Sequence, residues 1–216
     1  MVIRLKNEEL ERLNNMLTYE RAVKILGYES ICGVDEAGRG PLAGDVFAAA
    51  VILPDGYILE GLNDSKKLSE KKREALFDII CQDAVAYSIK TATVNEIDEI
   101  NIRNATYLAM RRAISSLSPK ADYALIDGDC ITELSLPHQC VIKGDAKSLS
   151  IAAASILAKV ARDRYMEELA KEYPQFLFEK HKGYGTALHT ELLRKHGPSP
   201  VHRRTFLKKI LKDDEY

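Results

Sequence analysis

The amino-acid sequence predicts an α/β fold in which a mixed β-sheet carries helices on its faces. Short apolar runs with the length of buried strands occur at 31–35, 46–53 and 123–126. A longer stretch with helical periodicity, at 95–117, separates the last two of these runs. Strands that alternate with helices in this way are typical of sheets covered by helices. The chain of 216 residues is long enough for one large domain or two small ones.

The chain begins with a segment that favours helix. Residues 5–26 are rich in Leu, Glu, Lys and Arg, and Leu10 and Leu13 follow helical spacing. We expect one or two surface helices there, ending at Gly27, which is a plausible residue just beyond a helix C-terminus. Residues 1–30 are therefore expected to be an N-terminal helical extension. The sequence does not decide whether this extension packs on the rest of the chain or is a mobile arm.

The first two strands are joined by a turn rich in glycine. Residues 31–35 form the first strand, and the run 46–53 forms the second, which ends before Pro54. The segment Gly38–Gly44 between them contains Gly and Pro at the positions where a turn is expected. A helix from Ser69 to about Cys81 follows the second strand.

The remaining elements complete the sheet and its helical cover. Residues 85–94 alternate and predict a strand, and Asn95 is the expected N-cap of a helix to Leu117. Short strands follow at 123–126 and 140–142. A long helix capped by Ser148 or Ser150 comes next, and Tyr173-Pro174 ends it. We expect a further, basic helical region from about residue 165.

Charge is balanced over the whole chain but not along it. Lys and Arg number 31 against 32 Asp and Glu, so the net charge of −1 shows no whole-chain basic signature for nucleic acid. Residues 180–212 differ, because they hold nine Lys or Arg and one acidic residue, Glu191, with four of the five histidines. Phosphate contacts must come from this local cluster. The histidines have no metal-ligand spacing, and we interpret them as surface or phosphate-contacting residues.

Cysteine usage and hydropathy indicate the compartment. The four cysteines lie far apart without a C-x-x-C pair, which argues against a zinc site and fits a reducing environment. Residues 1–6 carry charges in place of an apolar run, so we expect no signal peptide. No run of about 18 apolar residues predicts a membrane span. We therefore expect a cytoplasmic protein with no membrane association.

Carboxylates follow the predicted strands at the points where the strands end. Asp35 and Glu36 end the first strand, Asp127 ends a later one, and Asp145 follows the next. Clustered carboxylates resist ionisation unless a cation lies among them, and oxygen ligands suit Mg²⁺ or Mn²⁺. Two such ions can activate a water and stabilise a leaving oxygen in phosphodiester cleavage. The alternative is that they are ordinary solvated residues, which is the better interpretation for each taken singly.

The glycine-rich turn begins directly after the first two carboxylates. Glycine amides at Gly38 and Gly40 can approach a phosphate or a sugar hydroxyl closely, and Arg39 adds a permanent forked donor. An ordinary hairpin turn is the alternative. A glycine-rich turn that adjoins two acidic residues favours a ligand-binding function.

These motifs together resemble type 2 ribonuclease H, ribonuclease HII, in its bacterial form. The resemblance extends from about Gly33 to Phe206, and several separate motifs occur in the family's order. They are residues 35–44 (DEAGRGPLAG), 62–68 (LNDSKKL), 126–128 (IDG), 143–145 (KGD), 151–163 (IAAASILAKVARD), 181–186 (HKGYGT) and 202–204 (HRR).

The resemblance implies a ribonuclease H-like catalytic domain over 31–216 and Mn²⁺ or Mg²⁺ as cofactor. It implies an endonuclease that cuts the RNA strand of RNA–DNA hybrids and cuts 5′ to ribonucleotides within duplex DNA, leaving 3′-hydroxyl and 5′-phosphate ends. Matched residue by residue, the four metal-binding carboxylates are Asp35, Glu36, Asp127 and Asp145. Gly38, Arg39 and Gly40 match the triplet that senses the ribose 2′-hydroxyl, and Tyr184 matches the tyrosine that packs on the next sugar.

Phosphate contacts are expected from basic residues near these motifs, namely Lys66, Arg203 and Arg204. Asp45 departs from the family pattern, and Asp129 is an extra carboxylate that could assist a metal ion. Two alternatives remain. A type 3 ribonuclease H would need a large N-terminal domain, and a non-catalytic hybrid-binding module would need a broken acidic cluster. We expect a monomer.

Overall fold

The computed structural model describes residues 7–128, 131–208 and 210–211. Within these residues the strands form one five-stranded sheet in the order β3-β2-β1-β4-β5. The strands are β1 (Ile31–Ala37), β2 (Val46–Ile52), β3 (Ala86–Ala92), β4 (Tyr123–Asp127) and β5 (His138–Val141). β2 is antiparallel to both β1 and β3, whereas β4 is parallel to both β1 and β5. The predicted mixed sheet is confirmed.

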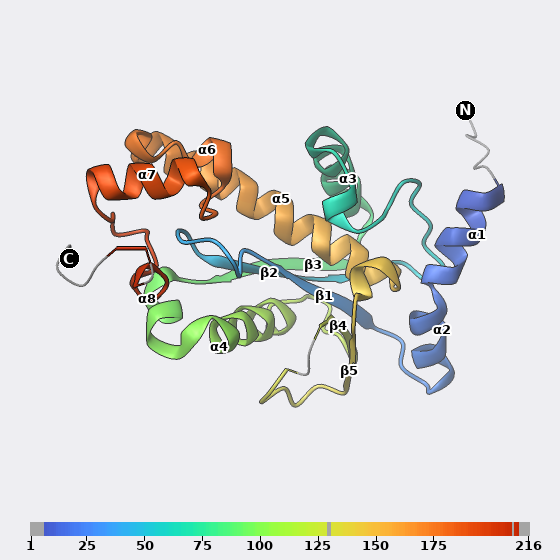
Figure 1. The fold of residues 1–216 in the computed structure, drawn as a ribbon. Helices are drawn as coiled ribbons and strands as arrows, with labels where there is room; N and C mark the ends of the chain where they lie inside the picture. The colour runs from blue at the N-terminus through green and yellow to red at the C-terminus, as the bar shows by residue number, and fades with distance from the viewer. Residues whose placement is uncertain (1–6, 129–130, 209, 212–216) are drawn as a thin grey trace.

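Long helices cover the two faces of the sheet (Figure 1). α4 (Val94–Ser115) packs on one face, and α5 (Leu149–Glu172) packs on the other with α3 (Glu70–Asp83) beside it. Side chains of β2 alternate between the two resulting cores: Ala48 and Ala50 lie in the core on the α4 side, and Ala49 and Val51 lie in the core on the α5 side. Burial on both faces explains why this strand is continuously apolar.

The start of α5 lies directly on β1. A Cβ atom added to Gly33 would lie 2.1 Å from the backbone carbonyl carbon of Ser150, so only glycine allows this approach. The contact places the first turn of α5 beside the strand that carries Asp35.

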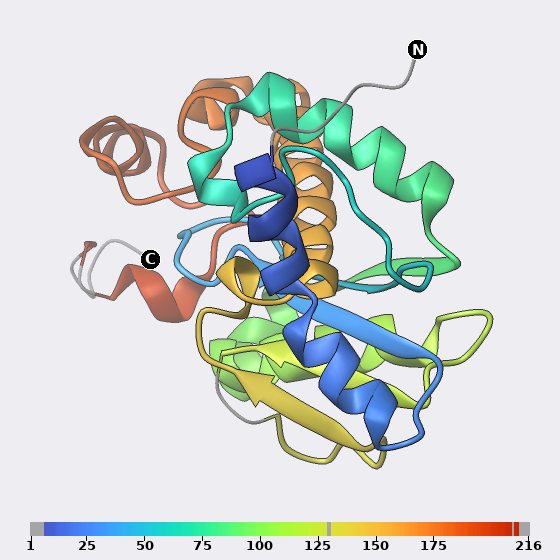
Figure 2. The same ribbon diagram turned by 90° about the vertical axis from the view of Figure 1, so that its right-hand side faces the viewer.

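The N-terminal extension packs at one end of the molecule (Figure 1), which is the end that faces the viewer in Figure 2. It consists of α1 (Asn7–Met16) and α2 (Thr18–Ile25). Leu13 and Leu17 are buried in the same core as the first turns of α5, and Leu10 is exposed. The question that the sequence left open is thus answered for the described residues, because the extension packs on the sheet and its helices.

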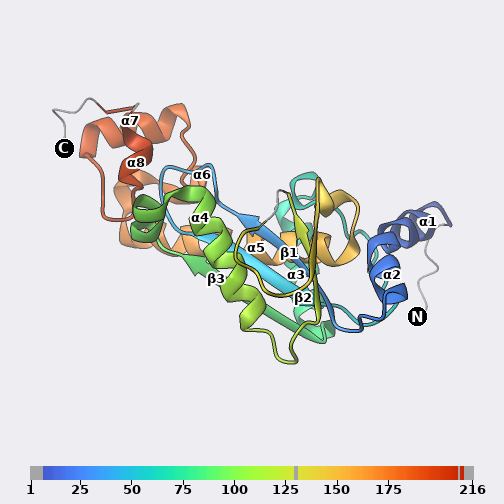
Figure 3. The same cartoon turned by 90° about the horizontal axis from the view of Figure 1, so that it is seen from below.

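The C-terminal helices lie at the opposite end from α1 and α2 (Figure 3). They are α6 (Phe178–His181), α7 (Ala187–His196) and α8 (Arg204–Leu207). Their hydrophobic core includes Leu42 and Ala43 of the glycine-rich turn. The C-terminal region is therefore built around that turn.

Three short 3₁₀ helices join the main elements: η1 (Ser65–Lys67), η2 (Gly144–Ala146) and η3 (Pro174–Phe176). None of the helices in the described ranges combines the length and the apolar character needed to span a bilayer.

Several predicted boundaries are wrong. β1 continues to Ala37, two residues beyond its predicted end, and β3 ends at Ala92, two residues before its predicted end. The N-cap of α4 is Thr93 and not Asn95, because Thr93 and Glu96 form a reciprocal capping box. The fifth strand begins at His138, two residues earlier than predicted, and Ile142 lies outside it with 69% of its surface exposed. The apolar character of Ile142 had drawn the predicted strand too far along the chain.

Candidate active site

Asp35 and Asp127 lie on neighbouring parallel strands. Val34 of β1 pairs with Ile126 of β4, so this register brings the next residues, Asp35 and Asp127, side by side at the ends of the strands. Asp35 is only 5% exposed, and its Oδ1 accepts a hydrogen bond of 2.7 Å from the amide of Glu36.

Asp145 reaches the same edge of the sheet through the turn after β5. The amide of Gly144 donates to Asp127 Oδ1 at 2.6 Å, which ties the turn to the end of β4. A Cβ atom on Gly144 would lie 2.6 Å from Ile151 Cδ1 and 3.2 Å from Asp127 Oδ1, so a larger residue would displace the Ile151 side chain and crowd Asp127. Asp145 is 7% exposed.

The carboxylates oppose one another's ionisation. Burial raises the pKa of Asp35 well above its usual value, and the charges of Glu36 and Asp127 raise it further. Burial also raises the pKa of Glu36, although Arg39 opposes this shift. Burial raises the pKa of Asp145, with contributions from neighbouring carboxylates that include Asp127. The site therefore holds more negative charge than its surroundings neutralise.

Two side chains place positive charge beside these carboxylates. Arg39 Nη1 lies 3.6 Å from Glu36 Oε1, and Lys66 Nζ lies 4.0 Å from Asp145 Oδ2. Burial lowers the pKa of Lys66, but the surrounding carboxylates outweigh it and the net shift is upward. The carboxylates thus favour a positively charged group at this edge of the sheet.

The donor set fits a hard divalent cation. All four predicted ligands offer oxygen atoms, which Mg²⁺ and Mn²⁺ prefer, and a cation would relieve the repulsion described above. Within the described residues no three His, Cys, Asp or Glu side chains are already arranged to hold a metal ion. The fit therefore rests on oxygen chemistry and charge.

The glycine-rich turn is fixed by a buried arginine from the C-terminal region. Arg203 donates from Nη2 to Gly38 O at 2.6 Å and from Nε to Gly44 O at 2.8 Å. Its Nη1 donates to Arg39 O at 3.0 Å and to Pro41 O at 2.8 Å. One guanidinium group thus holds four carbonyls of the turn.

The expectation that Arg203 contacts phosphate does not fit its position. Arg203 is 0% exposed and binds backbone carbonyls within the protein. Burial and the nearby charge of Arg162 lower its pKa to about 9. Arg204 differs, since its side chain lies on the surface while its amide donates to Asp98 Oδ2 at 2.9 Å. The sequence could not separate these two neighbours, because their burial depends on tertiary contacts.

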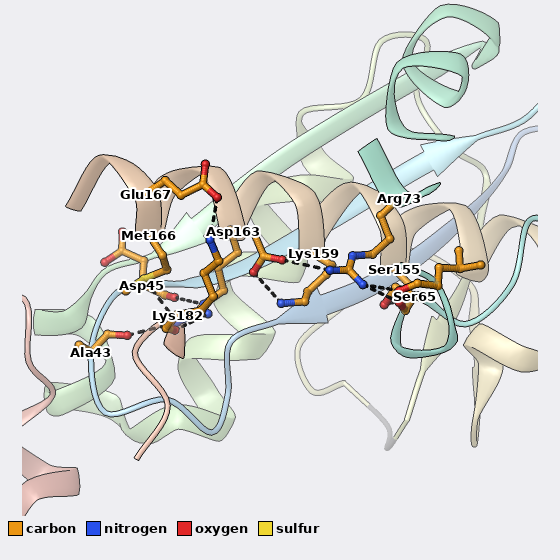
Figure 4. Close-up of polar contacts among 12 residues, drawn as sticks. Ala43, Asp45, Ser65, Arg73, Ser155, Lys159, Asp163, Met166, Glu167 and Lys182 are labelled. Atoms are coloured by element: carbon orange, nitrogen blue, oxygen red, sulfur yellow. Dashed lines mark hydrogen bonds and ion pairs between the residues drawn. The ribbon is translucent and has the colours of Figure 1, made fainter. Parts of the chain in front are cut away.

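A second buried arginine, Arg162 of α5, was not predicted. It donates to the carbonyls of Ala43, Asp45 and Lys182 at 3.2, 3.3 and 3.1 Å, and Figure 4 shows these three acceptor residues beside α5. A Cβ atom on Gly38, where φ is +98°, would lie 2.1 Å from Arg162 Nε. Arg162 therefore joins the turn to the segment that leads to Tyr184. Its place in the 151–163 motif was the available signal.

Tyr184 lies beside the glycine-rich turn and remains accessible. It is 44% exposed, and a Cβ atom on Gly40 would lie 3.8 Å from its Cε1. The preceding residue is fixed by a hydrogen bond of 2.8 Å from Leu42 N to Gly183 O. The structure thus brings Gly38, Arg39, Gly40 and Tyr184 together, next to the strand that carries Asp35 and Glu36.

Three of the C-terminal histidines are buried, which contradicts their interpretation as surface residues. Ser199 N donates to His202 Nδ1 at 3.0 Å, so His202 Nε2 must donate to His189 Nε2, also at 3.0 Å. His189 Nδ1 then donates to Tyr184 O at 2.9 Å. His181 stacks on His189 with ring centroids 4.3 Å apart. The three imidazoles form part of the support for Tyr184, and their burial reflects aromatic packing that the sequence does not reveal.

Residues that sequence reasoning missed hold Ser65, the neighbour of Lys66; Figure 4 shows Ser65 with Ser155 and Arg73. Ser65 Oγ hydrogen-bonds Ser155 Oγ at 2.8 Å, and Ser155 also hydrogen-bonds Asp35. Arg73 Nη1 donates to Ser65 O at 3.2 Å, and Arg73 Nη2 pairs with Asp163 Oδ2 at 3.6 Å. These contacts tie the loop that carries Lys66 to α5, whose Ser155 also contacts Asp35.

Two other features lie apart from the predicted ligands. Asp45 accepts from Val94 N at 3.1 Å and supports the start of α4. A cavity of about 180 Å³ lies between α2 and the sheet, lined by Leu17, Lys24 and Tyr57 among others, and none of the four predicted ligands lines it. Asp129 lies outside the described residues.

Relatives identified by sequence agree with the motifs. The chain matches the family model of Ribonuclease HII over residues 32–209. Ribonuclease HII of Caldicellulosiruptor bescii is 57% identical over 185 residues, which cover 86% of this chain and 90% of the relative. Ribonuclease HII of Caldanaerobacter subterraneus subsp. tengcongensis is 52% identical over 204 residues, or 94% of this chain and 85% of the relative.

Solved structures show the same fold. Ribonuclease H2 from Pyrococcus horikoshii OT3 has a TM-score of 0.71 at 29% identity and covers 84% of this chain and 97% of its own. Bst-RNase HIII in complex with Mn²⁺ has a TM-score of 0.64 at 19% identity, covering 82% and 65%. At this level of identity, the similarity to the type 3 enzyme is one of fold alone. The relatives found by sequence are ribonucleases HII, which does not support the alternative of a non-catalytic binding module. The chain belongs to the ribonuclease HII family and is a ribonuclease H, a hydrolase.

Proposed function

We propose that this enzyme hydrolyses the RNA strand of RNA–DNA hybrids and also cuts 5′ to single ribonucleotides in duplex DNA, leaving 3′-hydroxyl and 5′-phosphate ends. One juxtaposition carries the proposal. The turn Gly38–Gly40 continues directly from β1, which carries Asp35 and Glu36 near its end, and the exposed ring of Tyr184 lies beside Gly40. A sugar held by the turn would thus lie next to the carboxylates.

The proposed ligands of Mn²⁺ or Mg²⁺ are Asp35, Glu36, Asp127 and Asp145. When bound, such ions activate a water and stabilise the leaving oxygen of a phosphodiester. The chain's own contribution is to hold the carboxylates at one edge of the sheet, through the parallel pairing of β1 with β4 and the hydrogen bond from Gly144 to Asp127.

Selection for RNA would come from the turn and the tyrosine. RNA differs from DNA at each sugar by the 2′-hydroxyl, so donors must be aimed at that oxygen. The amides of Gly38, Arg39 and Gly40 are suited to this, and Tyr184 would pack on the next deoxyribose. Lys66 and Arg204, both exposed, would contact phosphates without reading sequence. We expect the enzyme to act as a monomer in the cytoplasm.

The test uses two fluorescent duplexes, one with an all-RNA strand paired with DNA and one with a single ribonucleotide in DNA. Cleavage should need Mn²⁺ or Mg²⁺, stop in EDTA and fall on the 5′ side of the single ribonucleotide. Cleavage on its 3′ side, or undiminished cleavage in EDTA, would contradict the proposal. The ends of the products are read by ligation and by phosphatase treatment.

A further inference from the structure

Glu20 of α2 caps the start of α5. Its Oε1 accepts hydrogen bonds from Ser148 Oγ at 2.6 Å, from Ser150 N at 3.0 Å and from Ser150 Oγ at 2.7 Å. Both serines are buried. The first turn of α5 has no acidic residue of its own, so Glu20 supplies the negative charge that a helix N-terminus favours. The carboxylate comes from a segment that is remote in sequence, and such a contact exists only when the extension is docked.

The segment that Glu20 caps also carries Asp145. Ser148 N donates to Gly144 O at 2.8 Å, which closes the turn around Asp145. The other end of this turn is fixed by Gly144 N, which donates to Asp127 Oδ1 at 2.6 Å. Consecutive hydrogen bonds thus run from Glu20 to Asp127, and they pass through the turn that carries Asp145.

The first helix of the extension holds the opposite side of the site. Arg12 Nη2 donates to Leu62 O at 2.8 Å, and Glu9 Oε1 accepts from Gly61 N at 3.1 Å. Gly61 and Leu62 belong to the loop that leads to Lys66, and Lys66 Nζ lies 4.0 Å from Asp145 Oδ2. The extension therefore contacts both the loop that carries Lys66 and the segment that follows Asp145, and these two side chains lie next to each other.

Apolar packing also fixes the extension against α5. Leu13, Met16 and Leu17 of the extension share one core with Leu149 and Ala152 of α5, and all five side chains are buried. Movement of the extension relative to α5 would open this core. Val23, after Glu20 in α2, shares a second core with Ile151 of α5, so apolar packing before and after Glu20 fixes its position.

We propose that α1 and α2 form a positioning element of the carboxylate site, and that Glu20 is a positioning residue that sets its affinity for a divalent cation through the turn carrying Asp145. The inference rests on the proposed function, in which Asp145 is a metal ligand. The match to the family model begins at residue 32, so this role falls outside the matched segment. Groups that orient a metal ligand without touching the metal commonly change affinity by about 10–100-fold.

The experiment measures Mn²⁺ binding to the intact chain by isothermal titration calorimetry. Glu20→Ala should weaken Mn²⁺ binding by roughly tenfold. Glu20→Gln keeps an oxygen that can accept the three hydrogen bonds and should lose less. The matched control is Arg21→Gln, because Arg21 lies on the same helix but donates to Asn14, at 3.2 Å to its carbonyl and 2.8 Å to its Oδ1, and not to α5. The control should bind Mn²⁺ like the wild type.

A double-mutant cycle separates positioning from general loss of stability. In an Asp145→Asn background, Glu20→Ala should cause a smaller loss of Mn²⁺ affinity than in the wild type, since one of the two ligands that Glu20 helps to position is already gone. If Glu20→Ala fails to fold, Glu20→Gln and Glu20→Asp take its place in the cycle.

The outcomes are distinguishable. Wild-type affinity in the Glu20 variants, or an equal loss with and without Asp145→Asn, would overturn the positioning role and leave the proposed function intact. Wild-type affinity in Asp145→Asn alone would overturn the metal role of Asp145 and this inference together.

Discussion

Asp35 is a buried carboxylate beside two others, and its position favours function over stability. Its folded pKa is raised, so at neutral pH the folded state holds a charge that the unfolded chain holds at lower cost. Asp35→Asn removes this repulsion and should raise the melting temperature in EDTA. The same change should reduce cleavage by about 100-fold or more, beyond the usual effect of residues that only support a metal ligand. Calorimetric melting and hybrid cleavage measure the two effects.

The control for this substitution is Asp55→Asn. Asp55 is exposed and pairs with Lys24 at 2.8 Å, far from the candidate site. It should change neither the melting temperature in EDTA nor cleavage appreciably. A lower melting temperature for Asp35→Asn would show that the charge of Asp35 does not destabilise the fold. Near wild-type cleavage would show that Asp35 is not a metal ligand.

Tyr184 offers a second test at the residue scale. A ring packs well on a deoxyribose, whose 2′ carbon is apolar, and poorly on a ribose. Tyr184→Ala should therefore lose more activity on a single ribonucleotide in DNA than on an all-RNA strand paired with DNA. The measurement is the ratio of the two cleavage rates, with the melting temperature recorded alongside. An unchanged ratio would make Tyr184 a packed loop aromatic with no part in recognising the junction.

Among the elements, the glycine-rich turn depends on Arg203 while its neighbour Arg204 faces solvent. Arg203→Gln leaves several buried carbonyls without donors and should destabilise the fold by about 3 kcal/mol or more. Arg204→Gln should leave stability unchanged but reduce the slope of log affinity against log salt by roughly one unit. Denaturant melts and hybrid binding at several salt concentrations check both. Equal salt slopes for Arg204→Gln and wild type would place Arg204 away from the phosphates.

At the scale of the whole molecule, the buried histidines make the C-terminal region sensitive to acid. Burial lowers the pKa of His189 to about 4 and that of His202 to about 3. Below about pH 6.5 the unfolded chain binds protons that the folded chain cannot, so the free energy of unfolding falls as pH falls toward 4. The loss should be on the order of 1–2 kcal/mol per histidine at pH 5. The raised pKa values of Asp35, Glu36 and Asp145 act in the opposite direction.

A variant separates the two effects. His202→Gln cannot take up this proton and should reduce the difference in melting temperature between pH 7 and pH 5, measured in EDTA. His196→Gln, at an exposed position, should leave that difference unchanged. If both variants keep the full difference, the acid sensitivity has another origin.

Most of the fold, and the placement of Asp35 and Asp127 on neighbouring strands, could be predicted from the sequence for a physical reason. Strand ends are local features, so Asp35 and Asp127 could be placed from apolar runs alone. The T-x-x-E pattern at Thr93 was equally local, and it predicts the N-cap better than Asn95 does. Arg203 could not be assigned in the same way, because its burial depends on a turn more than 150 residues away in the chain.

Six of the seven carbonyls from Gly38 to Gly44 accept hydrogen bonds from the side chains of Arg162 and Arg203 or from the amide of Arg203. The N–H groups of Leu42 and Gly44 also bond within the protein, to Gly183 O and Val201 O. The turn can therefore offer a ligand the N–H groups of Gly38, Arg39 and Gly40, while six of its acceptors face the protein. Such a surface recognises an atom with a lone pair and does not require that atom to carry hydrogen. A duplex with a 2′-fluoro sugar should accordingly compete for this turn better than the 2′-deoxy duplex, in a binding assay without metal.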